Sequence, residues 1–106
     1  MKTCTPEQAK RLGRAIQHRT VTLVSEDPAT ESGYDQFLGF EDFLRREFPR
    51  AALALRWEKL GELALLGCWE PANAAAAEPG LLFYAHYDVV PAIEESSWTH
   101  PPFSGD

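Results

Sequence analysis

Apolar residues recur at a helical spacing near the start of the chain. Ala9, Leu12 and Ile16 follow one another at i, i+3 and i+7, so they fall on one stripe of a helix. The preceding segment Thr5–Gln8 is typical of a helix start, because it offers a capping threonine, then a proline, then a glutamine three residues after the cap. The β-branched run Thr20–Val24 then predicts an extended segment that leaves this helix.

A second helical pattern covers about Tyr34 to Phe48. Its large apolar side chains gather on one face, at Phe37, Phe40, Leu44 and Phe48. We expect this face to pack against a sheet, which is a commoner role for such a stripe than lining a ligand pocket. Pro49 ends the helix, because the residue before a proline is pushed out of the helical region. Residues 25–33, with a proline and a glycine, are predicted to form a loop.

Three strands are predicted in the second half of the chain. The first has large apolar residues at alternate positions, namely Leu53, Leu55 and Trp57. A turn over Glu58–Gly61 leads to a second strand over Glu62–Trp69, and the two strands should form a hairpin. The continuous apolar run Leu81–Ala85 predicts a central strand covered on both faces. Together these elements predict an α/β layered fold with a mixed β-sheet flanked by helices, one whose sheet looks incomplete.

Composition and charge narrow the class of protein. The chain has 106 residues, 44% of them hydrophobic and 25% charged, as in ordinary globular domains. Its net charge of −6 argues against nucleic acid or an anionic membrane as partner, since both recruit basic surfaces. No signal peptide or bilayer-spanning apolar stretch is visible, so we expect a cytoplasmic location. Cys4 and Cys68 are too few for a disulfide framework, and Cys68 is expected to be a small buried hydrophobe.

The predicted central strand ends in residues that carry chemistry, His86, Tyr87 and Asp88. Side chains alternate along an extended segment, so His86 and Asp88 should point the same way, about 6.6 Å apart along the strand. A neutral imidazole is a good zinc ligand, and a nearby carboxylate commonly fixes its orientation. On these residues alone, a polar strand end with satisfied hydrogen bonds explains the pattern as well as a metal site does.

Two longer motifs favour the metal site. The segment Leu82–Ala92, LFYAHYDVVPA, resembles the first metal-site motif of the dizinc peptidase and deacylase family, and Trp98–Asp106, WTHPPFSGD, follows at the spacing that family uses. The family includes carboxypeptidase S, glutamate carboxypeptidase, aminoacylase, acetylornithine deacetylase and succinyl-diaminopimelate desuccinylase. The resemblance implies a zinc-exopeptidase fold and hydrolysis of peptides or N-acyl amino acids by water activated between two zinc ions. It also implies that His86 is a metal ligand and that Asp88 is the active-site Asp that supports this ligand.

The resemblance also implies what lies outside residues 1–106. The bridging Asp, the Glu that serves as base and the other ligands follow Asp106 in the family. We therefore expect this chain to be the N-terminal part of the catalytic domain, without a second domain, inactive by itself and prone to aggregate. A homodimer is possible for the full-length enzyme. The alternative is a truncated remnant that acts at most as a weak metal-binding or interaction fragment.

Other polar residues are further candidates for the site. His100 could be a second ligand, but the family keeps none at this position, so a role in loop packing or at the surface is favoured. The pair Glu94-Glu95 is misplaced for the family's base and ligand, and a solvated loop explains it better. His18, at the end of the first predicted helix, is expected to serve in capping.

Overall fold

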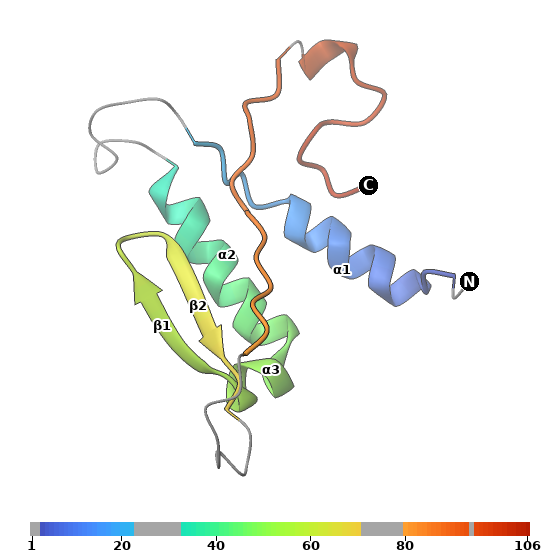
Figure 1. Cartoon of the computed structure of the whole chain (residues 1–106). Coiled ribbons are helices and arrows are strands. Elements are labelled where there is room, and N and C mark those ends of the chain that lie inside the picture. Colours follow the sequence, from blue (N-terminus) through green and yellow to red (C-terminus); the bar gives the residue numbers. More distant parts are fainter. Residues whose placement is uncertain (1–2, 23–32, 71–79, 94) are drawn as a thin grey trace. The chain divides into compact units, whose positions relative to one another are not determined.

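The computed structural model describes residues 3–22, 33–70, 80–93 and 95–106 (Figure 1). The chain divides into two compact units. The first, here called the terminal unit, comprises Met1–Phe43 and Tyr87–Asp106. The second, the hairpin unit, comprises Leu44–His86.

Helix α1, Pro6–Ile16, begins as the sequence predicts. The Thr5 hydroxyl accepts a hydrogen bond from the Gln8 backbone N–H at 3.2 Å, and the Gln8 side chain accepts one from the Thr5 N–H at 2.8 Å. This reciprocal capping box satisfies two of the backbone donors that a helix start leaves open. The predicted apolar stripe is not buried, since Leu12 is 62% exposed and the buried position of the helix is Gly13.

Helix α2, Tyr34–Glu47, confirms the second predicted helix to within a residue. Its buried apolar side chains are Phe37 and Phe43, whereas Phe48 is exposed, so the predicted face was only partly right. The prediction was only partly right because the rings of this part of α2 pack against single side chains, such as His18, instead of a flat sheet. Of the predicted extended run, Val21 forms a parallel bridge with Val89.

The hairpin unit starts with a short helix that the sequence did not predict. Helix α3, Pro49–Ala54, occupies the place of the expected strand around Leu53, which is 90% exposed. Pro49 is favourable at the first helical position, and the alanines after it are strong helix formers, so local propensity outweighs the alternating pattern.

The predicted hairpin is confirmed, with shifted boundaries. Strand β1, Arg56–Leu60, pairs antiparallel with β2, Ala64–Cys68, so that Trp57 lies opposite Gly67. Gly61 makes the turn with φ 64°, a conformation that favours glycine. The Trp57 indole N–H donates to the Ala52 carbonyl at 3.3 Å and ties α3 to β1. Cys68, expected to be buried, is half-buried.

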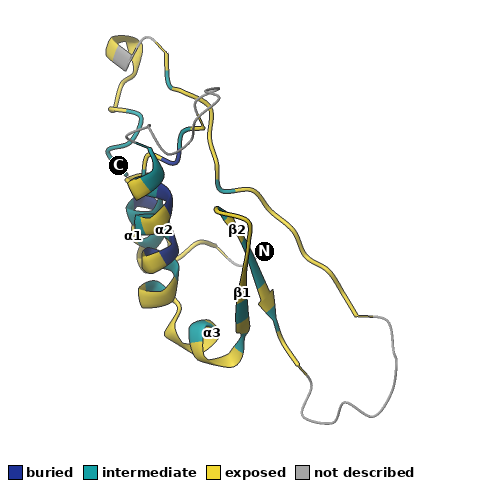
Figure 2. Ribbon diagram, turned by 90° about the vertical axis from the view of Figure 1, so that its left-hand side faces the viewer, coloured by how far each residue is buried: buried dark blue, intermediate teal, exposed yellow. Residues whose placement is uncertain are grey.

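The predicted central strand Leu81–Ala85 is extended but uncovered, which corrects the expectation of burial on both faces (Figure 2). Phe83 is 88% exposed and Tyr84 94%. No other described segment forms a strand ladder with it, because the described sheet consists of β1 and β2 alone. Residues 23 and 24 of the predicted extended run and residues 25–32 of the predicted loop lie outside the described residues, as do residues 71–79.

Helices and an antiparallel hairpin make the chain a mixed α/β structure, as predicted. In the described ranges, no helix combines the length and the apolar character that crossing a membrane requires.

Candidate functional site

The backbone on both sides of Asp88 is held by the segment that follows α1. The buried Thr20, 3% exposed, donates its hydroxyl to the Tyr87 carbonyl at 2.5 Å. The Val89 N–H donates to the Thr20 carbonyl at 2.8 Å, and the Thr22 N–H donates to the Val89 carbonyl at 3.3 Å. Thr20 and Thr22 are β-branched and favour the extended backbone that this parallel pairing needs. Asp88 is thereby fixed in the terminal unit by contacts that link distant parts of the sequence.

The Asp88 carboxylate itself is exposed. Its Oδ2 accepts a hydrogen bond from the Thr22 hydroxyl at 3.4 Å, near the long limit for such a bond. A carboxylate held on one side and open to solvent can accept a further hydrogen bond from an imidazole or approach a metal ion.

Tyr87 packs in an aromatic layer on α2, which consists of the rings of Phe37, Phe40 and Phe43. Its ring stacks on Phe40, with centroids 5.3 Å apart and planes 13° apart, and meets Phe37 edge-on at 5.6 Å. Burial raises the pKa of the Tyr87 phenol, and the carboxylates of Glu41 and Asp88 raise it further. Alternation along an extended chain then directs the side chain of Asp88 away from this layer.

His18 packs on the same aromatic layer. Its ring lies 5.8 Å from that of Phe40 and 5.3 Å from that of Phe43, measured between centroids. The His18 backbone N–H donates to the Ala15 carbonyl at 3.2 Å, which closes the end of α1. The ring contacts give His18 a packing role that the expectation of capping alone did not include.

His86 is the last residue of the hairpin unit, and its side chain is exposed. An imidazole and, two residues later, a carboxylate are donor types that suit zinc, so the chemistry of these two groups fits the predicted metal. Within the described residues, no group of three or more His, Cys, Asp and Glu side chains is placed to hold a metal ion. The assignment of His86 as ligand and Asp88 as its support therefore stays a prediction.

The segment Trp98–Asp106 packs on α1. The Gln17 side-chain amide donates to the Ser104 carbonyl at 2.9 Å, and the Arg19 guanidinium lies 4.8 Å from the centroid of the Phe103 ring. The backbones of Gly13 and Gly105 touch, and Gly105 has φ 82°. Sequence reasoning missed this docking, for which the glycine in the middle of a helical pattern was the available signal.

His100 lies in this segment, with Nδ1 4.0 Å from the Asp106 carboxylate. Both side chains are about two-thirds exposed, at 66% and 68%, so the contact is a weak surface pair when the imidazole is protonated. Neither residue belongs to a cluster of three metal-binding side chains among the described residues. Glu94 lies outside the described residues, and Glu95 opens a short 3-10 helix, Glu95–Ser97.

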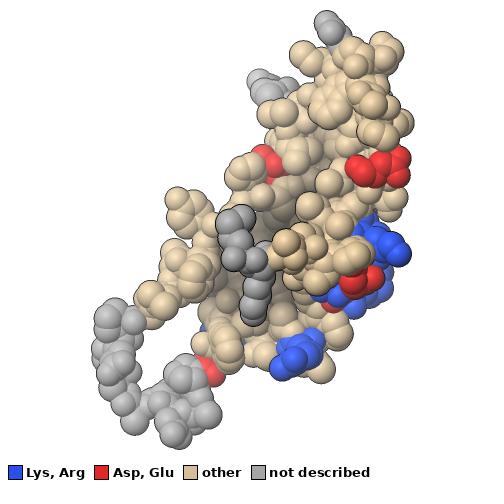
Figure 3. Space-filling view, turned by 90° about the vertical axis from the view of Figure 1, so that its right-hand side faces the viewer, with Lys and Arg blue, Asp and Glu red and all other residues tan. Residues whose placement is uncertain are grey.

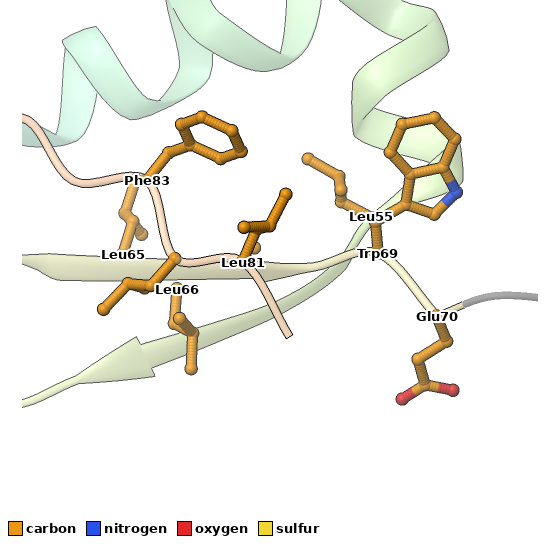
Figure 4. A pocket seen from close by; sticks show the side chains of 9 residues that line it. Leu55, Leu65, Leu66, Trp69, Glu70, Leu81 and Phe83 are labelled. Carbon is orange, nitrogen blue, oxygen red and sulfur yellow. The ribbon is translucent and has the colours of Figure 1, made fainter. Parts of the chain in front are cut away.

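The hairpin unit also has an apolar hollow of about 890 Å³ (Figure 4). Leu55, Leu65, Leu66, Trp69, Leu81, Leu82 and Phe83 are among its lining residues. The carboxylate of Glu70, the one titratable side chain in this lining, points away from the labelled apolar side chains. Uncharged residues also form most of the surface in Figure 3. Apart from the Glu70 carboxylate, the lining residues offer apolar contact and no group for acid, base or nucleophilic chemistry.

Comparison with curated proteins connects this chain to amide-bond hydrolases. The chain is 37% identical over 100 residues to carboxypeptidase S of Saccharomyces cerevisiae, covering 91% of this chain and 17% of that protein. It is 32% identical over 100 residues to the probable carboxypeptidase S-like 2 of Dictyostelium discoideum, covering 93% of this chain and 18% of that protein. It is 35% identical over 68 residues to succinyl-diaminopimelate desuccinylase of Caulobacter vibrioides, covering 64% and 17%.

The chain thus spans less than a fifth of the length of these relatives, while most of the chain is matched by the first two. No family model matches the chain, and no solved structure does.

Proposed function

The chain belongs to the peptidase and deacylase family of carboxypeptidase S and succinyl-diaminopimelate desuccinylase. We therefore propose that it forms part of a zinc-dependent hydrolase that cleaves amide bonds of peptides or N-acyl amino acids. The observation that carries the proposal is the motif LFYAHYDVVPA over Leu82–Ala92, within a chain related to these enzymes over most of its length. The names of the relatives support both substrate types, since one is a carboxypeptidase and one removes a succinyl group.

In this proposal His86 holds a zinc ion through its imidazole, and the carboxylate of Asp88 orients that imidazole. A bound zinc ion supplies acidified water and polarises the amide carbonyl. The chain's own contribution is positional. Tyr87 is held in the aromatic layer on α2, and Thr20 bonds the Tyr87 carbonyl. These contacts fix the position of the Asp88 backbone.

The first test is zinc binding to the 106-residue chain, followed by NMR on its histidines. We expect zinc to move the imidazole signals of His86 before those of His18, which is packed on aromatic rings, and of His100. His86→Ala should abolish the zinc binding that these signals report, while His100→Ala, the matched control, should leave it. Equal zinc affinity in His86→Ala and the unsubstituted chain would contradict the assignment.

The second test is turnover by the complete gene product, assayed with a dipeptide and an N-acyl amino acid. His86→Ala should abolish zinc-dependent hydrolysis with the far-ultraviolet circular dichroism unchanged, because the exposed His86 contributes little to packing. His100→Ala should retain hydrolysis. Full activity of the His86→Ala enzyme would refute the proposal.

A second candidate function rests on the absence of a complete metal-binding cluster in the described ranges. One imidazole with one carboxylate does not close a tetrahedral zinc site. The 106-residue chain would then be at most a weak metal-binding or interaction fragment. We expect no amide hydrolysis above the buffer blank from the purified chain, and measurable hydrolysis would exclude this second candidate.

A further inference from the structure

We propose that Thr22 is a positioning residue for Asp88, acting through the side-chain hydrogen bond between them, an inference that rests on the proposed zinc site. The Thr22 hydroxyl lies 3.4 Å from Asp88 Oδ2. The two residues are far apart in sequence, so the contact exists only because the fold brings their segments together. Thr22 donates from the segment after α1 to the side chain that is expected to orient the His86 imidazole.

The backbone contacts around Asp88 explain why a threonine at this position can reach it. Thr20 bonds the Tyr87 carbonyl with its hydroxyl and the Val89 N–H with its carbonyl. Val21 bridges Val89 in parallel register. Side chains alternate along extended segments, so Thr20 and Thr22 project to the same side of their segment. The buried Thr20 bonds the backbone, and the exposed Thr22 donates to the Asp88 carboxylate.

The difference in burial separates a positioning role from a structural one. Thr20 is 3% exposed, so loss of its hydroxyl would leave the Tyr87 carbonyl without that donor and would destabilise the fold. Thr22 is exposed, and its backbone N–H bond to Val89 does not depend on its side chain. Replacing the Thr22 side chain therefore changes the Asp88 contact while the bridge to Val89 stays.

Such a contact has a defined consequence for metal binding. A carboxylate that supports a ligand histidine is itself commonly fixed by hydrogen bonds, and loss of such an outer partner typically costs about 10–100-fold in metal affinity. The Thr22 bond is long and exposed, so the low end of this range applies. We expect about a tenfold loss of zinc affinity when the hydroxyl is removed.

The experiment is a zinc titration of the 106-residue chain, read on the His86 imidazole signals. Thr22→Val removes the hydroxyl and keeps the β-branched shape. Thr22→Ser restores the hydroxyl and should return the affinity to within about twofold of the unsubstituted chain. Thr3→Val, which removes an exposed hydroxyl elsewhere, is the matched control and should not change the affinity. The amide signals of Val21 and Val89 report whether the bridge persists in every variant.

The outcomes decide separately between this inference and the proposed function. A weaker affinity in Thr22→Val that Thr22→Ser restores supports the positioning role. An unchanged affinity in Thr22→Val, with zinc bound at His86, overturns it. If the unsubstituted chain binds no zinc at His86, the proposed metal assignment fails. The χ1 couplings of Asp88 then decide the inference: averaging in Thr22→Val alone supports positioning, and equal averaging in both chains overturns it.

Discussion

The contact between Gly13 and Gly105 gives the sharpest prediction about stability. A Cβ atom built on Gly13 would lie 2.2 Å from the Gly105 carbonyl oxygen, where real Cβ contacts stay above 3.0 Å. The clash is with backbone on both sides, because a Cβ on Gly105 would lie 2.5 Å from the Gly13 carbonyl oxygen. These closest contacts are all with backbone atoms, and no flexible side chain can move aside to relieve them. The Trp98–Asp106 segment must therefore shift as a whole.

The sign of the Gly13→Ala effect separates two explanations. Within a helix, replacing glycine by alanine ordinarily stabilises by about 0.5–1 kcal/mol. Forcing a methyl group into a packed contact costs about 1–3 kcal/mol. Displacing the segment also endangers the bond from Gln17 to the Ser104 carbonyl, worth about 0.5–1.5 kcal/mol. We therefore expect Gly13→Ala to lower the free energy of unfolding by about 1–3 kcal/mol.

Urea denaturation followed by circular dichroism measures this change, and hydrogen exchange on α1 locates it. Gly80→Ala is the control, because nothing lies within 4 Å of the added Cβ. Gly13→Ala and Gly105→Ala should be non-additive, since each disrupts the same contact. A Gly13→Ala chain as stable as the unsubstituted one, or more stable, would refute the reasoning and show that helix propensity dominates.

Three further predictions concern substitutions of single residues. Thr5→Ala should cost about 1 kcal/mol of stability through loss of the α1 capping box, while Thr5→Ser should not; equal urea midpoints for both variants would contradict this. Because the pKa of Tyr87 is raised on folding, the folded chain keeps this phenol proton to higher pH than the unfolded chain, so its contribution to stability is intact below about pH 10 and is lost as the pH rises further. Tyr87→Phe should therefore show a smaller loss of urea midpoint between pH 9 and pH 11, and an identical loss would exclude Tyr87 as the source. Gly61→Ala should weaken the hairpin by roughly 1–2 kcal/mol, because its φ of 64° is costly for alanine, whereas Gly61→Asn should weaken it less; cross-strand NMR contacts between Trp57 and Gly67 test this, and intact contacts at equal urea midpoints would contradict it.

Local signals in the sequence predicted the elements that depend on local physics. The capping box at Thr5 and the extent of α2 depend on residues within a few positions of one another, and both were confirmed. Helix α3 was missed although Pro49 is a good first helical residue, because the alternation of Leu53, Leu55 and Trp57 suggested a strand instead.

Contacts between distant segments were beyond the reach of pattern reasoning. The spacing of apolar residues in α1 did not reveal that Gly13 is its buried position. The run Leu81–Ala85 looked like a covered strand, but burial depends on neighbours that its own residues do not specify. For the site, motif and spacing pointed to His86 and Asp88, whereas the hydrogen bond from Thr22 could be found only once the fold placed the two segments together.

The terminal unit is discontinuous in sequence, and this affects the order of events during synthesis. Its first part ends at Phe43, and its second part begins at Tyr87. A ribosome adding about 5–20 residues per second needs several seconds to make the intervening hairpin unit. Throughout that interval the aromatic side chains of α2 have been made but lack Tyr87, the partner that later stacks on Phe40. Nascent chains of this protein should therefore depend on holding chaperones most strongly between these two points of elongation.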